Sequence, residues 1–163
     1  MDDLLNNLVG RWSLTGKMGD TALYQEVNAR WVLRELFVEV RSSPVRIGEG
    51  GNPDYEALYL IGYDKKTGEY ILHLSDTFGV TSKPVPGVGQ RKDNSIRFKF
   101  DYTVGPWFNT FTWDPGRGCW KEHHHLRTER WRRGNFCGKR IDPYSVSFLY
   151  LPRPLLWKCE RNK

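Results

Sequence analysis

The stretch from residue 55 to residue 79, YEALYLIGYDKKTGEYILHLSDTFG, decides the fold class of this chain. Two runs rich in β-branched, aromatic and leucine residues flank residues 64–68, a polar connection of hairpin length that ends in glycine. Glycine suits that place because the last residue of such a turn usually needs a positive φ angle. The stretch therefore predicts an antiparallel hairpin and a β-sheet protein.

Apolar and polar residues alternate with a period of two elsewhere in the chain, as they do in strands with one buried face. The clearest case is residues 96–102, where Ile96, Phe98 and Phe100 alternate with charged residues. Residues 23–33 and 36–41 could be two strands joined tightly near residues 32–34, or one long strand with a bulge. We count seven or eight short strands without a long helical pattern, which is typical of an antiparallel meander that closes into a barrel.

Two segments depart from this alternation. Leu4, Leu5 and Leu8 have helical spacing behind a capping aspartate, so a short helical turn is expected before Gly10. Residues 80–94, VTSKPVPGVGQRKDN, combine two prolines with two glycines and predict a loop that could cover a barrel mouth.

Composition bounds the class of protein. The chain has 163 residues, the size of one domain, and 39% of them are hydrophobic. No apolar run approaches the roughly 20 residues that span a bilayer, and the first ten residues do not resemble a secretory signal. The odd number of cysteines, three, argues against a disulfide framework. We therefore expect a cytoplasmic protein that does not act in a membrane.

The net charge of +6 is concentrated in the last quarter of the chain. Residues 1–119 hold 14 basic and 15 acidic residues, whereas residues 120–163 hold 11 and 4. We expect a barrel over residues 1–120 and a basic, irregular segment over residues 121–163, which is either a product of an altered reading frame or an extension that closes the barrel. Its basic and aromatic cluster predicts nonspecific attraction to polyanions at most, and no specific nucleic-acid partner; the cluster consists of Arg127, Arg130, Trp131, Arg132 and Arg133.

The order of several short motifs resembles the lipocalin-like (calycin) barrels, and in particular a family of small, mostly bacterial proteins without an established activity. The motifs are Gly10-Arg11-Trp12, Arg30-Trp31, Tyr55-Glu56-Ala57, Gly62-Tyr63-Asp64 and Ser75-Asp76-Thr77-Phe78-Gly79. The resemblance covers about residues 5–118. It implies an all-β, single antiparallel barrel with a short N-terminal helical turn, an internal cavity, and a structural tryptophan, Trp12, across the closed end.

A barrel of about eight strands is either filled by its own side chains or open enough for one small ligand. We expect such a barrel to bind a small apolar or amphipathic molecule without a cofactor or a metal. The pattern does not say which face of each strand points inward, and the candidate cavity residues are therefore Tyr24 or Trp31, Phe37, Tyr59, Leu72, His73, Phe98, Phe100 and Trp113.

Three other functions stay open at this stage. The first is a barrel that binds haem through His73, and the second is a small enzyme with Asp76 or His73 as a general base. The third is an interaction protein with a packed interior and no ligand. Common catalytic motifs are absent from the sequence, which gives an enzyme little support.

Cys119, His123 and His125 share one strand face and could hold zinc, although a solvated histidine run is the favoured interpretation.

Overall fold

The computed structural model describes residues 2–18, 21–45, 55–80, 84–103, 105–126 and 155–158. These residues form one short helix, α1 (Asp3–Asn6), and an all-β, antiparallel sheet. The strands are β1 (Gly10–Met18), β2 (Thr21–Val32), β3 (Phe37–Pro44), β4 (Ala57–Asp64), β5 (Glu69–Asp76), β6 (Gly87–Lys92), β7 (Ser95–Tyr102), β8 (Gly105–Asp114), β9 (Cys119–Leu126) and β10 (Leu155–Lys158).

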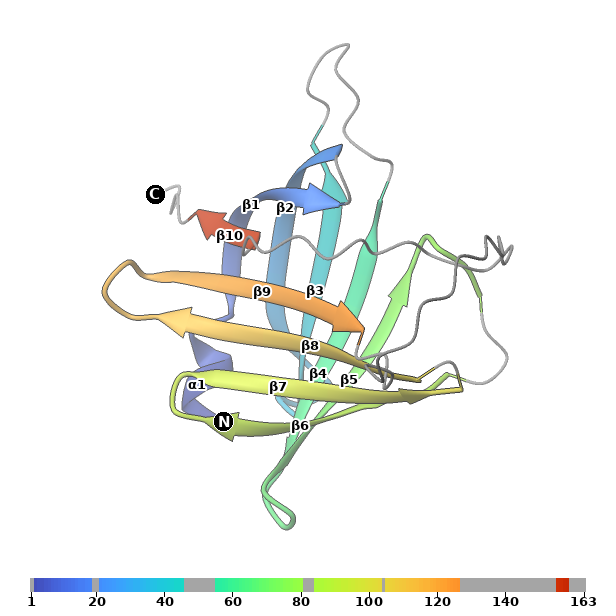
Figure 1. Cartoon of the computed structure of the whole chain (residues 1–163). Coiled ribbons are helices and arrows are strands. Elements are labelled where there is room, and N and C mark those ends of the chain that lie inside the picture. The colour runs from blue at the N-terminus through green and yellow to red at the C-terminus, as the bar shows by residue number, and fades with distance from the viewer. Residues whose placement is uncertain are drawn as a thin grey trace, which may run out of the picture.

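The strands from β1 to β9 follow one another as antiparallel neighbours in a strongly curled sheet (Figure 1). The short strand β10 lies between β1 and β9 and pairs with both. It pairs with β9 through Leu155 opposite Glu122 and Leu156 opposite Lys121. The expectation of an antiparallel all-β fold with a short N-terminal helical turn is confirmed. In the described part of the chain, no helix is long and apolar enough to cross a membrane.

The hairpin predicted from residues 55–79 is present. Strands β4 and β5 pair from Ala57 opposite Asp76 to Asp64 opposite Glu69. Gly68 has a φ angle of 74°, and its amide donates to the Asp64 carbonyl at 2.8 Å. The polar connection therefore forms the turn that its glycine indicated.

The two alternating runs between residues 23 and 41 are two strands, β2 and β3, rather than one bulged strand. The turn between them places Leu33, Arg34 and Glu35 at positive φ angles between 51° and 63°. None of the three is glycine, so each adopts a conformation that is unfavourable for an L-residue. The pairing of β2 with β3 offsets the conformational cost of this tight turn.

The expectation of a loop over residues 80–94 is wrong for its second half, because β6 occupies Gly87–Lys92. Glycine is normally unfavourable inside a strand since it has no side chain to pack. Here rings from β7 take that space: a Cβ atom on Gly87 would lie 2.6 Å from the Phe100 ring, and one on Gly89 would lie 2.6 Å from the Phe98 ring. The two glycines thus fit a strand that is covered by aromatic side chains.

The expected domain boundary at residue 120 falls inside β9, which continues to Leu126. Strand β9 is paired with β8 along its whole length, so the regular structure extends past the predicted break. The basic and aromatic cluster at residues 127–133 lies outside the described residues. Of the segment beyond β9, the structure describes β10, whose pairing with β1 and β9 is the one that an extension closing the barrel would make.

Helix α1 covers one end of the curled sheet. The side chain of Asp2 caps the helix by accepting a hydrogen bond from the Leu5 amide at 2.9 Å. Leu4, Leu5 and Leu8 are at most 1% exposed and belong to the core. The helical spacing of these leucines in the sequence is therefore the spacing that places them inside the sheet.

Indole groups fix α1 to the strands around it. Trp12 donates its Nε1 hydrogen to the Leu8 carbonyl at 2.8 Å, and Trp120 donates to the Asn7 carbonyl at 3.0 Å. The Trp113 ring lies between these two, with centroid distances of 6.3 Å to Trp12 and 5.5 Å to Trp120. Trp12 thus has the structural role that was expected of it, and α1 closes this end of the interior.

Candidate functional site

A group of buried polar side chains lies inside the sheet, towards the end away from α1. Strands β2, β3 and β8 each place one buried polar residue among apolar residues on the inward face, and β9 contributes Glu122 with His124 beside it. Within the described residues, the buried polar and charged side chains are Gln25, Ser42, Asn109 and Glu122. Buried polar groups cost free energy unless they are hydrogen-bonded, so the bonds of each of them are informative.

Gln25 and Ser42 satisfy one another. The Ser42 hydroxyl bonds to the Gln25 Oε1 atom, and the Gln25 amide donates from Nε2 to the Tyr55 carbonyl at 2.7 Å. These bonds tie β2 and β3 to the segment that leads into β4. These hydrogen bonds explain why Gln25 and Ser42 are buried, so the pair does not indicate a ligand.

Asn109 and Glu122 form the second pair, and this one is incomplete. The Asn109 amide donates from Nδ2 to the Glu122 Oε1 atom at 2.9 Å, and both residues are at most 2% exposed. The Asn109 Oδ1 atom has no hydrogen-bond partner among the described residues. A buried carbonyl oxygen without a donor costs about 1–3 kcal/mol, so its retention in the core requires a reason.

His124 completes the surroundings of the carboxylate. It pairs across the strands with Asn109, and its Nε2 atom lies 3.0 Å from the Glu122 Oε1 atom. The His124 ring also lies against Trp107, with ring centroids 5.1 Å apart. One face of β8 and β9 therefore presents an amide, a carboxylate, an imidazole and an indole together, and we refer to Trp107, Asn109, Glu122 and His124 as the Glu122 cluster.

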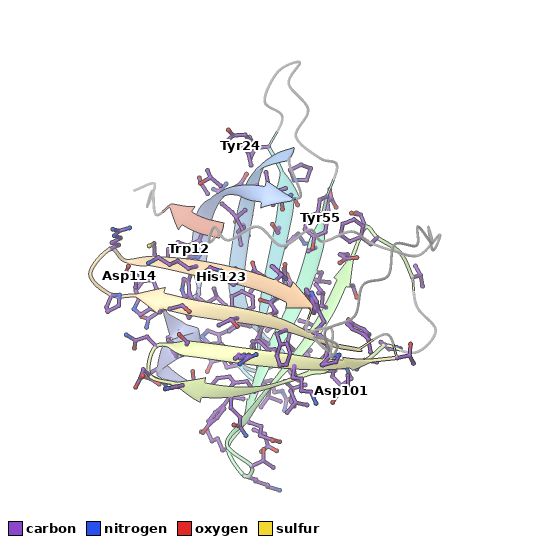
Figure 2. All side chains as sticks on the ribbon, viewed as in Figure 1. Trp12, Tyr24, Tyr55, Asp101, Asp114 and His123 are labelled. Atoms are coloured by element: carbon purple, nitrogen blue, oxygen red, sulfur yellow. The ribbon has the colours of Figure 1, made fainter. Side chains whose placement is uncertain are left out.

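Two tyrosines and a second carboxylate lie within electrostatic reach of this cluster. Tyr55 and Tyr59 are hydrogen-bonded to each other, and burial, followed by the charge of Glu122, raises the pKa of the Tyr59 hydroxyl well above its ordinary value. Burial also raises the pKa of Asp76, against the opposing effects of the Phe78 amide and of His124. Figure 2 shows Tyr55 at the start of β4, at the end of the sheet away from α1.

The structure places six of the candidate cavity residues on the inward face. Tyr59, Leu72, Phe98 and Phe100 are buried in the core, and Trp31 and Trp113 are partly buried against it. Their rings pack on one another, because Phe111 makes edge-to-face contacts with both Tyr59 and Phe98 at centroid distances of 6.0 Å. These residues fill the middle of the sheet with side chains, which is the packing that stabilises a core.

The remaining candidates face outward. Of the alternatives Tyr24 and Trp31, the inward residue is Trp31, and the assignment of Phe37 and His73 to the interior is wrong. Tyr24 is 39% exposed, on the face of β2 opposite to Leu23 and Gln25. Phe37 and His73 lie on the outer face of β3 and β5, with ring centroids 6.5 Å apart. Because alternate residues of a strand point to opposite faces, the burial of their neighbours excludes them from the interior.

The outward position of His73 also removes it as a haem ligand or a general base inside the barrel. Leu72 is fully buried beside it, as expected if the leucines of this strand fill the core. Asp76 lies on the inward face of β5 at the strand end and is half-buried, and its carboxylate accepts a hydrogen bond from the Phe78 amide at 3.0 Å. Of the two proposed bases, only Asp76 is therefore on the side of the interior.

The zinc alternative gains no geometric support. Cys119 is buried with a free thiol, whereas His123 is exposed on the outer face of β9. Over the described ranges, no group of three or more His, Cys, Asp or Glu side chains is placed to hold a metal ion. The side chain of His125, the third residue of the predicted set, lies outside the described residues.

A pocket of about 420 Å³ lies outside the sheet, between α1 and the turn from β4 to β5. Its polar groups bond to each other: Arg91 donates to both carboxylate oxygens of Asp3, at 2.6 and 3.2 Å, and Tyr70 donates to Asp2 at 2.8 Å. The hydrogen bond from Arg91 lowers the pKa of Asp3. The polar groups around the pocket thus bond to each other and join the start of the chain at Asp2 and Asp3 to β5 and β6.

The position of Asn109 in the sequence is a signal for the Glu122 cluster that the pattern of strands alone did not reveal. In residues 107–113 the side chains of one parity are Trp107, Asn109, Phe111 and Trp113, a single amide among aromatic residues. A lone polar residue at apolar parity marks either a buried hydrogen bond or a site. Glu122 and His124 were not considered as inward residues of a strand, because regular structure was expected to end near residue 121.

Comparison with known proteins adds no relative to this description. No family model, no curated protein and no solved structure matches the chain. The functional argument therefore depends on the residues themselves.

The raised pKa of Tyr59 predicts an alkaline effect on stability. The ordinary pKa of tyrosine is 10.0, and the folded-state value is higher because the hydroxyl is buried. The contribution of Tyr59 to stability is then fully present below about pH 10 and is lost as the pH rises through the folded-state pKa. Urea unfolding at about pH 8 and about pH 11 should show a smaller pH-dependent loss of stability in Tyr59→Phe than in the original protein. Equal losses would contradict the assignment.

Proposed function

We propose that this protein is a lipocalin-like β-barrel that binds a small amphipathic molecule at the Glu122 cluster. The observation that carries the proposal is the Asn109 Oδ1 atom, a fully buried acceptor for which the described residues supply no donor. A ligand that donates a hydrogen bond there would remove the cost of that acceptor. An unsatisfied polar group in the core is easier to explain by binding than by stability.

A ligand at this cluster would enter the interior from the end opposite α1. Helix α1 and the turn after it cover the other end, where Leu4, Leu5 and Leu8 are buried and the carbonyls of Asn7 and Leu8 accept hydrogen bonds from Trp120 and Trp12. The middle is filled by the ring contacts of Phe111 with Tyr59 and Phe98. A ligand would therefore bind towards the end opposite α1, with its polar group at Asn109 and its apolar part against aromatic side chains such as Trp107.

The lipocalin-like architecture is part of the same proposal. Its support is the order of the strands, in which β10 pairs with both β1 and β9, and the motif order around Trp12 and Tyr55. In a closed barrel the inward face is continuous and excludes water, so each Å² of apolar ligand surface buried there contributes about 25 cal/mol. Such a site would hold one small ligand.

The proposal is tested with N-phenylnaphthylamine, a neutral, environment-sensitive dye that has one N–H donor. Saturable one-to-one binding is expected, with an increase in dye fluorescence. Asn109→Ala should weaken binding by roughly twofold to tenfold, the equivalent of one hydrogen bond. The matched control is His73→Ala on the outer face, which should leave the affinity unchanged. If the folded protein gives no saturable signal, the interior is packed and an interaction protein without a ligand is the better explanation.

A further inference from the structure

We infer that the Glu122 cluster selects ligands with a protonated amine head group and an apolar tail. This inference rests on the proposed function, because it names the class of molecule that the proposed site would take. It goes beyond the proposed function by predicting the charge of the ligand.

The first argument is the balance of charge. Within the described residues, Glu122 is the one buried carboxylate, no buried side chain there is a lysine, arginine or histidine, and Asp76 is half-buried on the same inward face. The imidazole beside them belongs to His124, and even when it is protonated it balances one of the two carboxylates. A carboxylate in a desolvated place is stabilised by an opposite charge, which an ammonium group would supply.

The second argument is the count of donors and acceptors. The Asn109 Nδ2 atom already donates to Glu122, so the open position at Asn109 is its carbonyl oxygen, an acceptor. An ammonium group carries three hydrogens and no acceptor, and it can bond to this oxygen and to the nearby carboxylate at once. A carboxylate head group brings acceptors only and would leave Asn109 Oδ1 unsatisfied.

The third argument is the aromatic surroundings. Trp107 is 9% exposed and its ring lies tilted against the His124 ring, and Phe111 lies opposite Glu122 in the pairing of β8 with β9. The face of an indole ring attracts cations, while the apolar body of the ring accepts a hydrocarbon chain. One wall of the site is thus suited to both parts of an alkylamine.

The test uses three ligands with the same tail: octylamine, octanol and octanoate, each measured by displacement of the dye. Octylamine is expected to bind at least about tenfold more tightly than octanol, and octanoate more weakly than octanol, because a hydrogen-bonded charge contributes more than a neutral group. Glu122→Gln should reduce the octylamine affinity about tenfold or more and change the octanol affinity by less than about twofold. The control is Glu26→Gln, which removes a carboxylate that is paired with Arg11 on the outer surface.

The outcomes separate this inference from the proposed function. If the dye and all three ligands fail to bind, the proposed function is wrong and the inference falls with it. If the dye binds but octanoate or octanol binds as tightly as octylamine, the function stands and the inference is overturned. Should Glu122→Gln not fold, Asp76→Asn provides the second test: a loss of octylamine affinity supports the inference, and an unchanged affinity overturns it.

Discussion

Replacing Leu5 with alanine should lower the free energy of unfolding by about 2–5 kcal/mol, the range for a large-to-small change in a packed core. The Leu5 side chain is fully buried between α1 and the strands, and its amide is bonded to the capping Asp2. A cavity at this place weakens the contact of the whole helix with the sheet. Urea unfolding followed by tryptophan fluorescence measures the change.

The control for this prediction is Leu36→Ala, in the turn between β2 and β3. Leu36 is 65% exposed, so the same deletion of three carbons should change the free energy of unfolding by less than about 0.5 kcal/mol. Similar effects at both positions would mean that α1 is not packed as the structure describes.

Gly89→Ala is expected to destabilise the protein by about 1–3 kcal/mol, although alanine is normally the better residue outside turns. The added Cβ atom would lie 2.6 Å from the Phe98 ring and 3.2 Å from Ile96. Phe98 is fully buried and its ring is held by Phe111, so it cannot move away without disturbing the core. Thermal or urea unfolding of the variant measures the loss.

A double-mutant cycle identifies the cause of this loss. In a Phe98→Leu background the ring is absent, and Gly89→Ala should cost clearly less than it does in the original protein. Gly116→Ala is the control, because a Cβ atom there would meet its nearest neighbour at 3.5 Å, an ordinary contact. Strict additivity of the Gly89 and Phe98 changes would rule out the steric explanation.

The parts of the fold that were predicted correctly are the parts that local sequence determines. The hairpin of β4 and β5 follows from two alternating runs and a turn that ends in Gly68. The burial of Leu4, Leu5 and Leu8 follows from their helical spacing. In each case residues close in sequence determine the local structure, and contacts with distant parts of the chain stabilise it further.

The errors arise where residues distant in sequence supply the missing interaction. Strand β6 was missed because Gly87 and Gly89 read as loop residues, and their compensation by Phe100 and Phe98 is visible only in three dimensions. For the same reason period-two alternation could not assign the inward face of β3, where Phe37 interrupts the pattern with an outward ring. Alternation shows that a strand has two different faces, and only the packing shows which of them is inside.

The Glu122 cluster illustrates the same limit for function. Asn109 and His124 are opposite each other across β8 and β9, but in the sequence they stand in an aromatic run and in a histidine run that suggested other roles. Their common site follows from the register of two strands, which no single segment contains.

The hydrogen bond from Trp120 to the Asn7 carbonyl joins residues that are 113 positions apart. During synthesis α1 leaves the ribosome well before its partner strand β9. Until then the leucines of α1 have no complete surface on which to pack, and the entropy of closing so long a loop opposes the contact. Contacts of such high sequence separation slow folding and leave apolar segments exposed for longer. We therefore expect α1 to dock late in folding, after β9 has been synthesised.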